Sequence, residues 1–278
     1  MKKIFDEVSE KCSEITTKRY STSFSLGIKL LDKNIHKPIY SIYGFVRVAD
    51  EIVDSFHDYN KKELLQQFKN ETQEAIKNKI SLNPILNSFQ NVVNQFNIEW
   101  EHIEHFLSSM ENDLDKKEHD EKSYKLYIKG SAEAVGLMCL RVFCNNDFKL
   151  YDELKEYAIS LGSVFQKVNF IRDISADYHH LKRVYFPNLE IENFNEEEKS
   201  KIENDIQKEF EAALIGIKKL PKSSKKGVFL AYSYYYSLFK KIKKTPANKV
   251  MTERLRVPDF IKLLILFKVE LKSLLNVI

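Results

Sequence analysis

The chain has 278 residues, of which 43% are hydrophobic and 30% charged, and its net charge is +4 at pH 7. This composition is typical of a soluble globular protein with a substantial core, and it excludes an intrinsically disordered chain. So small a net charge, with neither an RNP-like aromatic signature nor zinc-finger spacing, argues against nucleic acid as a partner.

The predicted elements are helices along almost the whole chain, because helical periodicity dominates and only seven Gly and six Pro interrupt it. We expect helices at residues 4–19, 22–31, 37–58, 61–79, 83–96, 99–117, 121–145, 150–179, 195–219, 223–243 and 252–275. Pro38 suits the first turn of its helix, and Pro84 and Pro221 mark breaks. Residues 179–194 lack periodicity and form a connection of about 15 residues, a length at which loops often cover a site. No linker or repeat divides the sequence, so residues 1–278 are interpreted as a single all-α domain.

The cysteines and the two ends of the sequence bear on the cellular location. Cys12, Cys139 and Cys144 form no CxxC pair and are interpreted as reduced, which favours the cytoplasm. The N-terminus lacks the apolar run of a signal peptide. Residues 260–278 are apolar but interrupted by charges, which predicts a packed amphipathic helix rather than a membrane span. A peripheral contact with the inner face of the membrane is the alternative.

The segment RVADEIVDS (Arg47–Ser55) places Asp50 and Asp54 four residues apart in an otherwise apolar run. On a helix these carboxylates share one face, with Tyr43 and Arg47 on the same side, and they repel each other by a few tenths of a kcal/mol. Either a bound cation or a face turned to water would explain why the sequence accepts this repulsion.

The segment FQKVNFIRDISADY (Phe165–Tyr178) repeats the arrangement, because Gln166, Asn169, Asp173 and Asp177 fall on one polar stripe. One such stripe is more often a solvent-exposed face. Two stripes with carboxylate and amide oxygens, on helices that face each other, favour a cleft that holds several magnesium ions. By contrast, the histidine pair in Glu101–His105 lacks an evident further zinc ligand and is interpreted as exposed.

A third segment supplies apolar space. In YIKGSAEAVGLMC, Tyr127, Gly130, Ser131 and Ala134 lie on one helical face, so that a phenol is followed by three small side chains. Close packing between helices would explain these residues equally well. Beside the two aspartate helices, however, a channel for a long apolar ligand gains support. Magnesium, a diphosphate and a hydrocarbon tail together indicate isoprenoid chemistry.

The sequence resembles the phytoene/squalene synthase family of head-to-head prenyl transferases, and it is most similar to the bacterial phytoene synthases. The resemblance rests on six segments in the family's order: YSTSF (Tyr20–Phe24), SIYGFVRVADEIVD (Ser41–Asp54), YIKGSAEAVGLM (Tyr127–Met138), FQKVNFIRDISADY, KRVYFP (Lys182–Pro187) and ERLRV (Glu253–Val257). It implies an isoprenoid-synthase fold, with helices around a central apolar cavity. It also implies a magnesium-dependent transferase that joins two prenyl diphosphates through a cyclopropylcarbinyl diphosphate.

The resemblance further implies roles for individual residues. Magnesium would be bound by Asp50, Asp54, Asp173 and Asp177, with support from Asn169. The diphosphates would be contacted by Ser21, Ser23, Arg47, Arg172, Arg183 and Tyr185. The catalytic group would be Arg47, Tyr43 and Tyr127, the tyrosines facing the carbocation, and Gln166 at the reacting centre.

Three functions follow from this resemblance. The first is synthesis of phytoene from two geranylgeranyl diphosphates in carotenoid biosynthesis, with no part for NADPH. The second is a squalene or dehydrosqualene synthase that uses farnesyl diphosphate. The third, a remote alternative, is a helical protein that binds prenyl lipids without catalysis. The sequence leaves the oligomeric state open.

Overall fold

The fold consists of helices joined by short connections, in a computed structural model that describes residues 1–115, 119–178, 184–187, 189 and 194–275. In chain order the helices are α1 (Lys2–Tyr20), α2 (Thr22–Lys29), α3 (Lys33–Asp54), α4 (Lys61–Asn78), α5 (Pro84–Phe96), α6 (Trp100–Asp115), α7 (Glu121–Ile128), α8 (Ala134–Cys144), α9 (Phe148–Ala176), α10 (Glu196–Lys219), α11 (Lys222–Lys244), α12 (Ala247–Val250) and α13 (Asp259–Leu274). A π-helical turn, η1 (Lys129–Glu133), joins α7 to α8. No β-strand occurs among the described residues, and the all-α prediction is confirmed.

Six helices begin at a polar residue whose side chain caps the first turn. The side chains of Ser21, Asn60, Asn83, Asp120, Asp147 and Asn195 accept hydrogen bonds from backbone N–H groups of α2, α4, α5, α7, α9 and α10. These N–H groups have no partner within the helix, and each cap typically contributes about 1 kcal/mol. The caps therefore explain most of the helix starts that the sequence predicted.

Three predicted helices differ from the observed ones. The helix expected at 37–58 runs from Lys33 to Asp54, so Pro38 lies in its second turn, where its missing N–H removes one backbone hydrogen bond. The helix expected at 121–145 is interrupted by η1. The helix expected from residue 252 begins only at Asp259, because Pro258 fits the position before a first turn.

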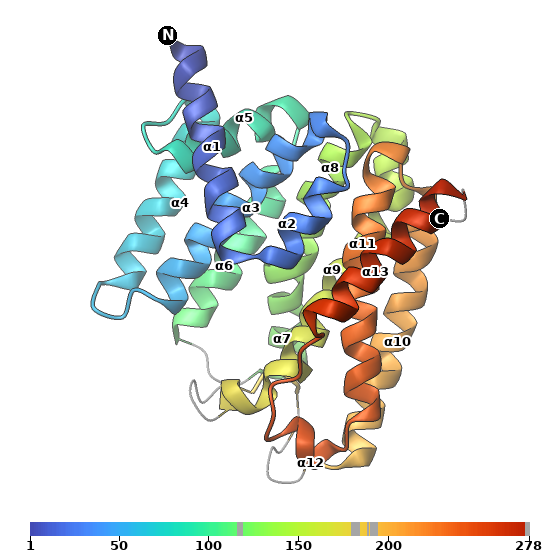
Figure 1. Cartoon of the computed structure of the whole chain (residues 1–278). Helices are drawn as coiled ribbons and strands as arrows, with labels where there is room; N and C mark the ends of the chain where they lie inside the picture. Colours follow the sequence, from blue (N-terminus) through green and yellow to red (C-terminus); the bar gives the residue numbers. More distant parts are fainter. Residues whose placement is uncertain (116–118, 179–183, 188, 190–193, 276–278) are drawn as a thin grey trace.

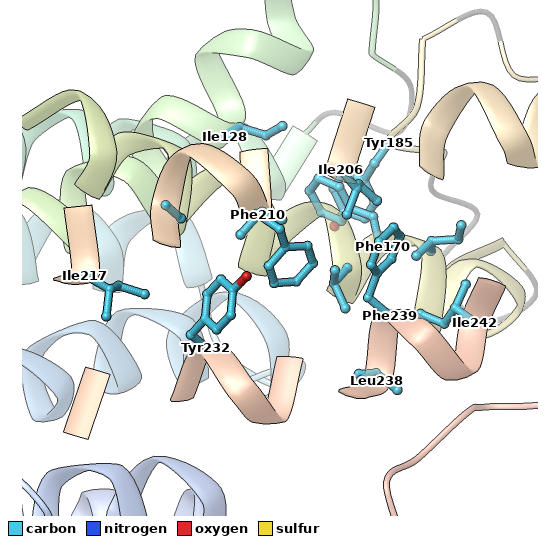
Figure 2. Packing of buried hydrophobic residues seen from close by; sticks show 14 of the residues in the cluster. Ile128, Phe170, Tyr185, Ile206, Phe210, Ile217, Tyr232, Leu238, Phe239 and Ile242 are labelled. Atoms are coloured by element: carbon cyan, nitrogen blue, oxygen red, sulfur yellow. The ribbon is translucent and has the colours of Figure 1, made fainter. Parts of the chain in front are cut away.

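Two clusters of buried side chains form the core, and α8 contributes to both. One cluster draws on α2–α6, and the other on α7 and α9–α12. In the second cluster, Phe210 of α10 meets Tyr232 edge-on, with ring centroids 5.4 Å apart, and lies 5.3 Å from Phe239 (Figure 2). Aromatic pairs of this kind contribute about 0.5–1.5 kcal/mol beyond their burial, so they hold α10 against α11.

The helices gather in two groups on either side of α8 and α9. Figure 1 shows α1–α6, in blue to green, on one side and α10, α11 and α13, in orange to red, on the other. Each group therefore presents helix faces toward α8 and α9. The space between these faces is where the predicted cavity has to lie.

The prediction that Glu101–His105 is exposed is wrong for His102. Its Nε2 lies 3.0 Å from the Tyr151 hydroxyl, and only 9% of the residue is exposed. The guanidinium of Arg141 stacks 3.6 Å above the Tyr151 ring and donates to Glu99. His102 therefore belongs to a buried polar group between α6, α8 and α9, which the spacing of charged residues did not reveal.

Helix α13 crosses the outside of α11 in Figure 1, and it also reaches α2. Its buried Val269 packs with Leu230 and Tyr234 of α11, and Leu26 of α2 and Leu30 lie against the same cluster. Within the described residues, no helix is both long enough and apolar enough to cross a bilayer.

Candidate active site

A cavity of about 390 Å³ lies between α2, α3, α8, α9, α10 and α11. Its wall is mainly aliphatic and aromatic, with few polar groups. Five of those polar groups are residues that the sequence selected: Ser21, Tyr43, Asp50, Gln166 and Asn169. An apolar cavity with polar groups on two of its helices is thus present, and Tyr43, Asp50, Gln166 and Asn169 lie on the helix faces that the periodicity predicted.

Helix α3 presents Tyr43, Val46 and Asp50 to the cavity, at the spacing of one helical face. Arg47 lies beside this face, where it pairs with Glu51 and has an N–H group 3.9 Å from a carboxylate oxygen of Asp50. Its guanidinium also lies 4.3 Å from the centre of the Tyr20 ring. Arg47 is therefore held in place beside Asp50 by contacts from α1 and from its own helix.

Asp50 lies in an environment that disfavours its negative charge. Burial raises its pKa to about 7, the carboxylates of Asp54 and Asp113 add to the rise, and Arg47 opposes it. The part of the side chain that stays exposed, 31%, faces the cavity. Asp113 of α6 is an acidic neighbour that no sequence pattern indicated. The end of α3 thus concentrates negative charge at the cavity wall.

Helix α9 presents Phe165, Gln166 and Asn169 to the same cavity. Phe165 stacks on Tyr235 of α11 with ring centroids 4.0 Å apart. The side-chain oxygen of Asn169 is buried and has no hydrogen-bond partner among the described residues. Because an unpaired buried carbonyl is unfavourable, this oxygen is available to a ligand that enters the cavity.

Asp173, one turn beyond Asn169, is held by two arginines. Arg172 pairs with both of its oxygens, and Arg254 donates to them at 2.8 and 3.4 Å. Arg254 comes from the segment between α12 and α13, and its side chain is 52% exposed. We assigned no role to Arg254 from the sequence, although it lies in the ERLRV segment that carries the resemblance.

The electrostatic surroundings of two tyrosines connect the two aspartate helices. Burial raises the pKa of Tyr43, and Tyr235 adds to the rise. Burial also raises the pKa of Tyr235, which in turn interacts with Arg172 and Asp173. Both phenols therefore stay protonated at neutral pH. Tyr43 interacts with Asp50 and Tyr235 interacts with Asp173, and both tyrosines line the cavity.

The serines of YSTSF differ in position. Ser21 lies between α1 and α2 with an extended backbone, and its hydroxyl accepts a hydrogen bond from the N–H of Phe24 at 3.2 Å. Ser21 lines the cavity, whereas Ser23 is half-buried and is not among the described residues that line it. The two serines predicted to contact the diphosphates thus differ in their position relative to the cavity.

Tyr127, which we expected to face the carbocation, is not among the described residues that line the cavity. Its hydroxyl donates to a carboxylate oxygen of Asp113 at 2.6 Å, and its ring lies 5.9 Å from Phe170 and 5.2 Å from Tyr185. Burial, with Asp113 beside it, raises the pKa of Tyr127 well above its ordinary value. Tyr127 is therefore linked to the Asp50 group through Asp113.

Tyr185 is likewise part of an aromatic stack, with its ring 4.2 Å from that of Phe170, and only 9% of it is exposed. It contacts Tyr127 and is not among the described residues that line the cavity. Arg183, the other residue predicted from KRVYFP, lies outside the described residues. Asp54 ends α3 and Asp177 follows the last residue of α9.

The small residues after Tyr127 are only partly where we expected them. Ser131 and Val135 line the cavity, whereas Ala134 is buried elsewhere. The π-helical turn η1 explains the difference, because it contains more residues per turn than an α-helix and shifts the face that follows it. Gly130 allows this turn to approach α6, since a Cβ there would lie 2.3 Å from the carbonyl oxygen of His105.

The residues present fit magnesium only in part. Carboxylate oxygens and the unpaired amide oxygen of Asn169 are the ligand types that magnesium prefers. Among the described residues, however, no three His, Cys, Asp or Glu side chains come together as a metal-binding group. An ion here would need further oxygens, for which the phosphates of a substrate are suited.

Comparisons with known proteins agree with this geometry. The family model for squalene/phytoene synthase matches residues 17–260. The chain is 25% identical to the 4,4'-diapophytoene synthase of Staphylococcus haemolyticus, over 72% of this chain and 69% of that protein. It is 27% identical to the phytoene synthase of Arthrospira platensis, over 67% of this chain and 63% of that protein.

Solved structures show the same fold. A dehydrosqualene synthase in complex with a ligand superposes with a TM-score of 0.82 over 99% of both chains, at 19% identity. The squalene synthase of Alicyclobacillus acidocaldarius gives a TM-score of 0.77 over 87% of this chain and 95% of that chain, at 18% identity. The isoprenoid-synthase fold predicted from the sequence is thereby confirmed. With the family match over residues 17–260, it follows that the chain belongs to the squalene/phytoene synthase family.

Proposed function

We propose that the chain is a magnesium-dependent prenyl transferase that condenses two geranylgeranyl diphosphates head to head to phytoene. The observation that carries the proposal is the apolar cavity of about 390 Å³, with Asp50 and Asn169 in its wall and the Asp173–Arg172–Arg254 group one turn beyond Asn169. Apolar space suits a hydrocarbon tail, and the charged groups suit a diphosphate and its counterions. The phytoene synthase of Arthrospira platensis among the relatives supports the choice of product.

The first step would break the C–O bond of one diphosphate, with the electron pair leaving on the diphosphate. The double bond of the second substrate then attacks the allylic cation, and loss of a proton closes a cyclopropane ring. A second ionisation, rearrangement and proton loss release the hydrocarbon. Each ionisation places negative charge on the leaving group, so fixed positive groups at that point lower the barrier.

The arginines are the groups of this chain suited to that task. Arg172 and Arg254 present guanidinium groups at Asp173, and Arg47 presents one beside Asp50. Guanidinium groups bind phosphate oxygens in pairs, which fixes the orientation of the diphosphate as well as its charge. A diphosphate that displaces the Asp173 carboxylate from Arg254 would gain this contact.

The wall of the cavity would act on the carbocation. Tyr43, Phe165 and Tyr235 present aromatic rings, whose faces attract positive charge. The apolar wall also keeps water from the cation, which would otherwise be captured as an alcohol. Tyr127 acts as a positioning residue in this scheme, because its hydroxyl orients Asp113 beside Asp50.

Magnesium, when bound, would neutralise the leaving diphosphate and hold it in position. Asp50 and Asp54 on α3, and Asn169, Asp173 and Asp177 in and directly after α9, are the residues suited to hold it. Asp173 would first have to be released by Arg254 and Arg172. We do not expect NADPH to take part.

Chain length is the finer part of the proposal. A twenty-carbon tail has five carbons more than a farnesyl tail, and each buried methylene contributes about 0.8 kcal/mol. A cavity that accommodates the whole tail therefore favours geranylgeranyl diphosphate by about 4 kcal/mol. A squalene or dehydrosqualene synthase is the second candidate, and the diapophytoene synthase among the relatives is the observation that favours it.

The test is incubation with magnesium and either labelled geranylgeranyl or labelled farnesyl diphosphate, followed by extraction and chromatography of the hydrocarbon. We expect a forty-carbon product, with no change on addition of NADPH. Faster formation of a thirty-carbon product from farnesyl diphosphate would favour the second candidate. No hydrocarbon from either substrate would indicate a protein that binds prenyl lipids without catalysis.

A further inference from the structure

The outer face of α13 is apolar, and no other described part of the chain covers it. It consists of Phe260, Leu263, Leu264, Phe267, Leu271 and Leu274, which are all exposed, Phe267 by 64% and Leu274 by 78%. At about 100° per residue these six side chains occupy one continuous strip of the helix. The opposite side, with Val269 at its centre, packs on α11. Helix α13 is therefore apolar both toward the protein and away from it.

Exposed apolar strips of this size usually mark a contact with another surface. Single exposed apolar side chains are normal on proteins, but six on one helix face are not. The charges near the strip indicate which kind of surface it contacts.

The part of the sequence that contains α11 and α13 is strongly positive. Residues 218–272 contain 15 Lys and Arg against three Asp and Glu, which gives this segment a net charge of +12. Because the whole chain has a net charge of +4, all other residues together carry −8. Lys268 and Lys272 are exposed on α13 itself, and Lys226 of α11 lies 2.5 Å from Glu270. An apolar strip in basic surroundings is complementary to a surface that is negatively charged outside and apolar inside.

We propose that the outer face of α13 docks onto the surface of an anionic phospholipid bilayer. A helix that lies in the plane of the membrane buries its apolar face among the acyl chains, while lysines beside it contact the anionic headgroups. A second copy of this chain fits less well, because both copies would bring the same basic surroundings together.

Docking at this face would place the cavity near the membrane. The inner side of α13 packs on α11, Leu26 of α2 lies against the same cluster, and both α2 and α11 line the cavity with their other faces. One layer of helices would then separate the bilayer from the cavity. The inference goes beyond the proposed reaction and does not depend on it, because membrane binding is measured without substrate.

The experiment is co-sedimentation of the full chain with vesicles of pure phosphatidylcholine or of equal parts phosphatidylcholine and phosphatidylglycerol. We expect binding to the anionic vesicles that weakens as salt is raised, since the screening length falls from about 10 Å at 0.1 M to about 3 Å at 1 M. The variant Phe260→Ser/Phe267→Ser/Leu271→Ser should bind at least about tenfold more weakly. Lys268→Gln and Lys272→Gln should each weaken binding by about fivefold.

A matched control removes three exposed apolar side chains elsewhere, in the variant Ile4→Ser/Leu82→Ser/Ile215→Ser, which should bind like the unchanged protein. Equal loss in the control and the α13 variant, or equal binding to both kinds of vesicle, would overturn the proposal. Sedimentation velocity without vesicles provides a second check. If the unchanged protein is a dimer and the α13 variant is a monomer, the proposal is overturned, because the strip would then be an interface between copies. Circular dichroism confirms that each variant remains helical.

Discussion

Replacement of Arg254 by alanine separates a role in diphosphate binding from a role in holding the fold. Arg254 is half-exposed and pairs with Asp173 at 2.8 Å. Exposed pairs contribute about 0–1 kcal/mol, so Arg254→Ala should lower the melting temperature by no more than about 2 °C. Loss of a guanidinium that stabilises the leaving diphosphate costs about 2–3 kcal/mol in the transition state, which lowers turnover by about 30–150-fold.

Arg141 is the matched control, because it makes a similar paired contact with Glu99 but has only 9% of its side chain exposed and lies away from the cavity. Arg141→Ala leaves Glu99 without this partner and the ring of Tyr151 uncovered, so it should cost about 3 kcal/mol of stability, or about 6 °C. The folded variant should keep its turnover.

The two arginines should thus show opposite effects, measured by thermal melting and by hydrocarbon formation under saturating substrate. Arg254→Lys should restore part of the activity, since it keeps the charge but not the paired geometry. A clear loss of stability in Arg254→Ala with unchanged turnover would refute the reasoning, and the Arg254–Asp173 pair would then be structural only.

Three further predictions concern the cavity and the buried polar group. The double variant Asp50→Asn/Asp54→Asn should lower hydrocarbon formation by orders of magnitude yet melt no lower than the unchanged protein, because it removes carboxylates that repel each other; near-normal product would contradict the metal assignment. Magnesium with inorganic diphosphate should raise the melting temperature of the unchanged protein but not of this variant, and no shift at saturation would count against a preformed site. Burial lowers the pKa of His102 to about 4, so the unfolded chain binds a proton first as the pH falls and stability is lost between about pH 6.5 and 4. Urea unfolding at the two ends of this range measures how much free energy of unfolding is lost. The loss should be about 2 kcal/mol smaller for His102→Gln than for the unchanged protein, after allowance for screening. Equal losses in the two proteins would contradict the assignment of this pH dependence to His102.

Helical periodicity was enough to predict the polar faces of α3 and α9. Tyr43 and Asp50, and Gln166 and Asn169, are each separated by nearly whole turns of a regular helix, and all four line the cavity. These positions could be predicted because α3 and α9 are uninterrupted helices over the residues concerned.

The positions that sequence reasoning missed depend on contacts between distant segments. Tyr127 was misplaced because η1 breaks the regular period, and the only local signal for that turn is Gly130. Asp113 belongs to no motif and reaches Asp50 only through the packing of α6 against α3. Arg254 was overlooked because a continuous helix was expected across Pro258, which in fact delays α13 to Asp259. His102 was misjudged because a charged neighbourhood in the sequence does not reveal burial by another helix.

The π-helical turn η1 bears on how related chains can diverge. Because such a turn accommodates an extra residue, deletion of one residue between Lys129 and Glu133 would let α7 and α8 run on as one regular helix. All side chains of α7 would then rotate by about 100° relative to α8. Tyr127 would leave Asp113, and its phenol would swing toward a different neighbour. A single-codon insertion or deletion at this point is thus an evolutionary route for moving a tyrosine between the packed interior and the cavity wall while the surrounding helices stay in place.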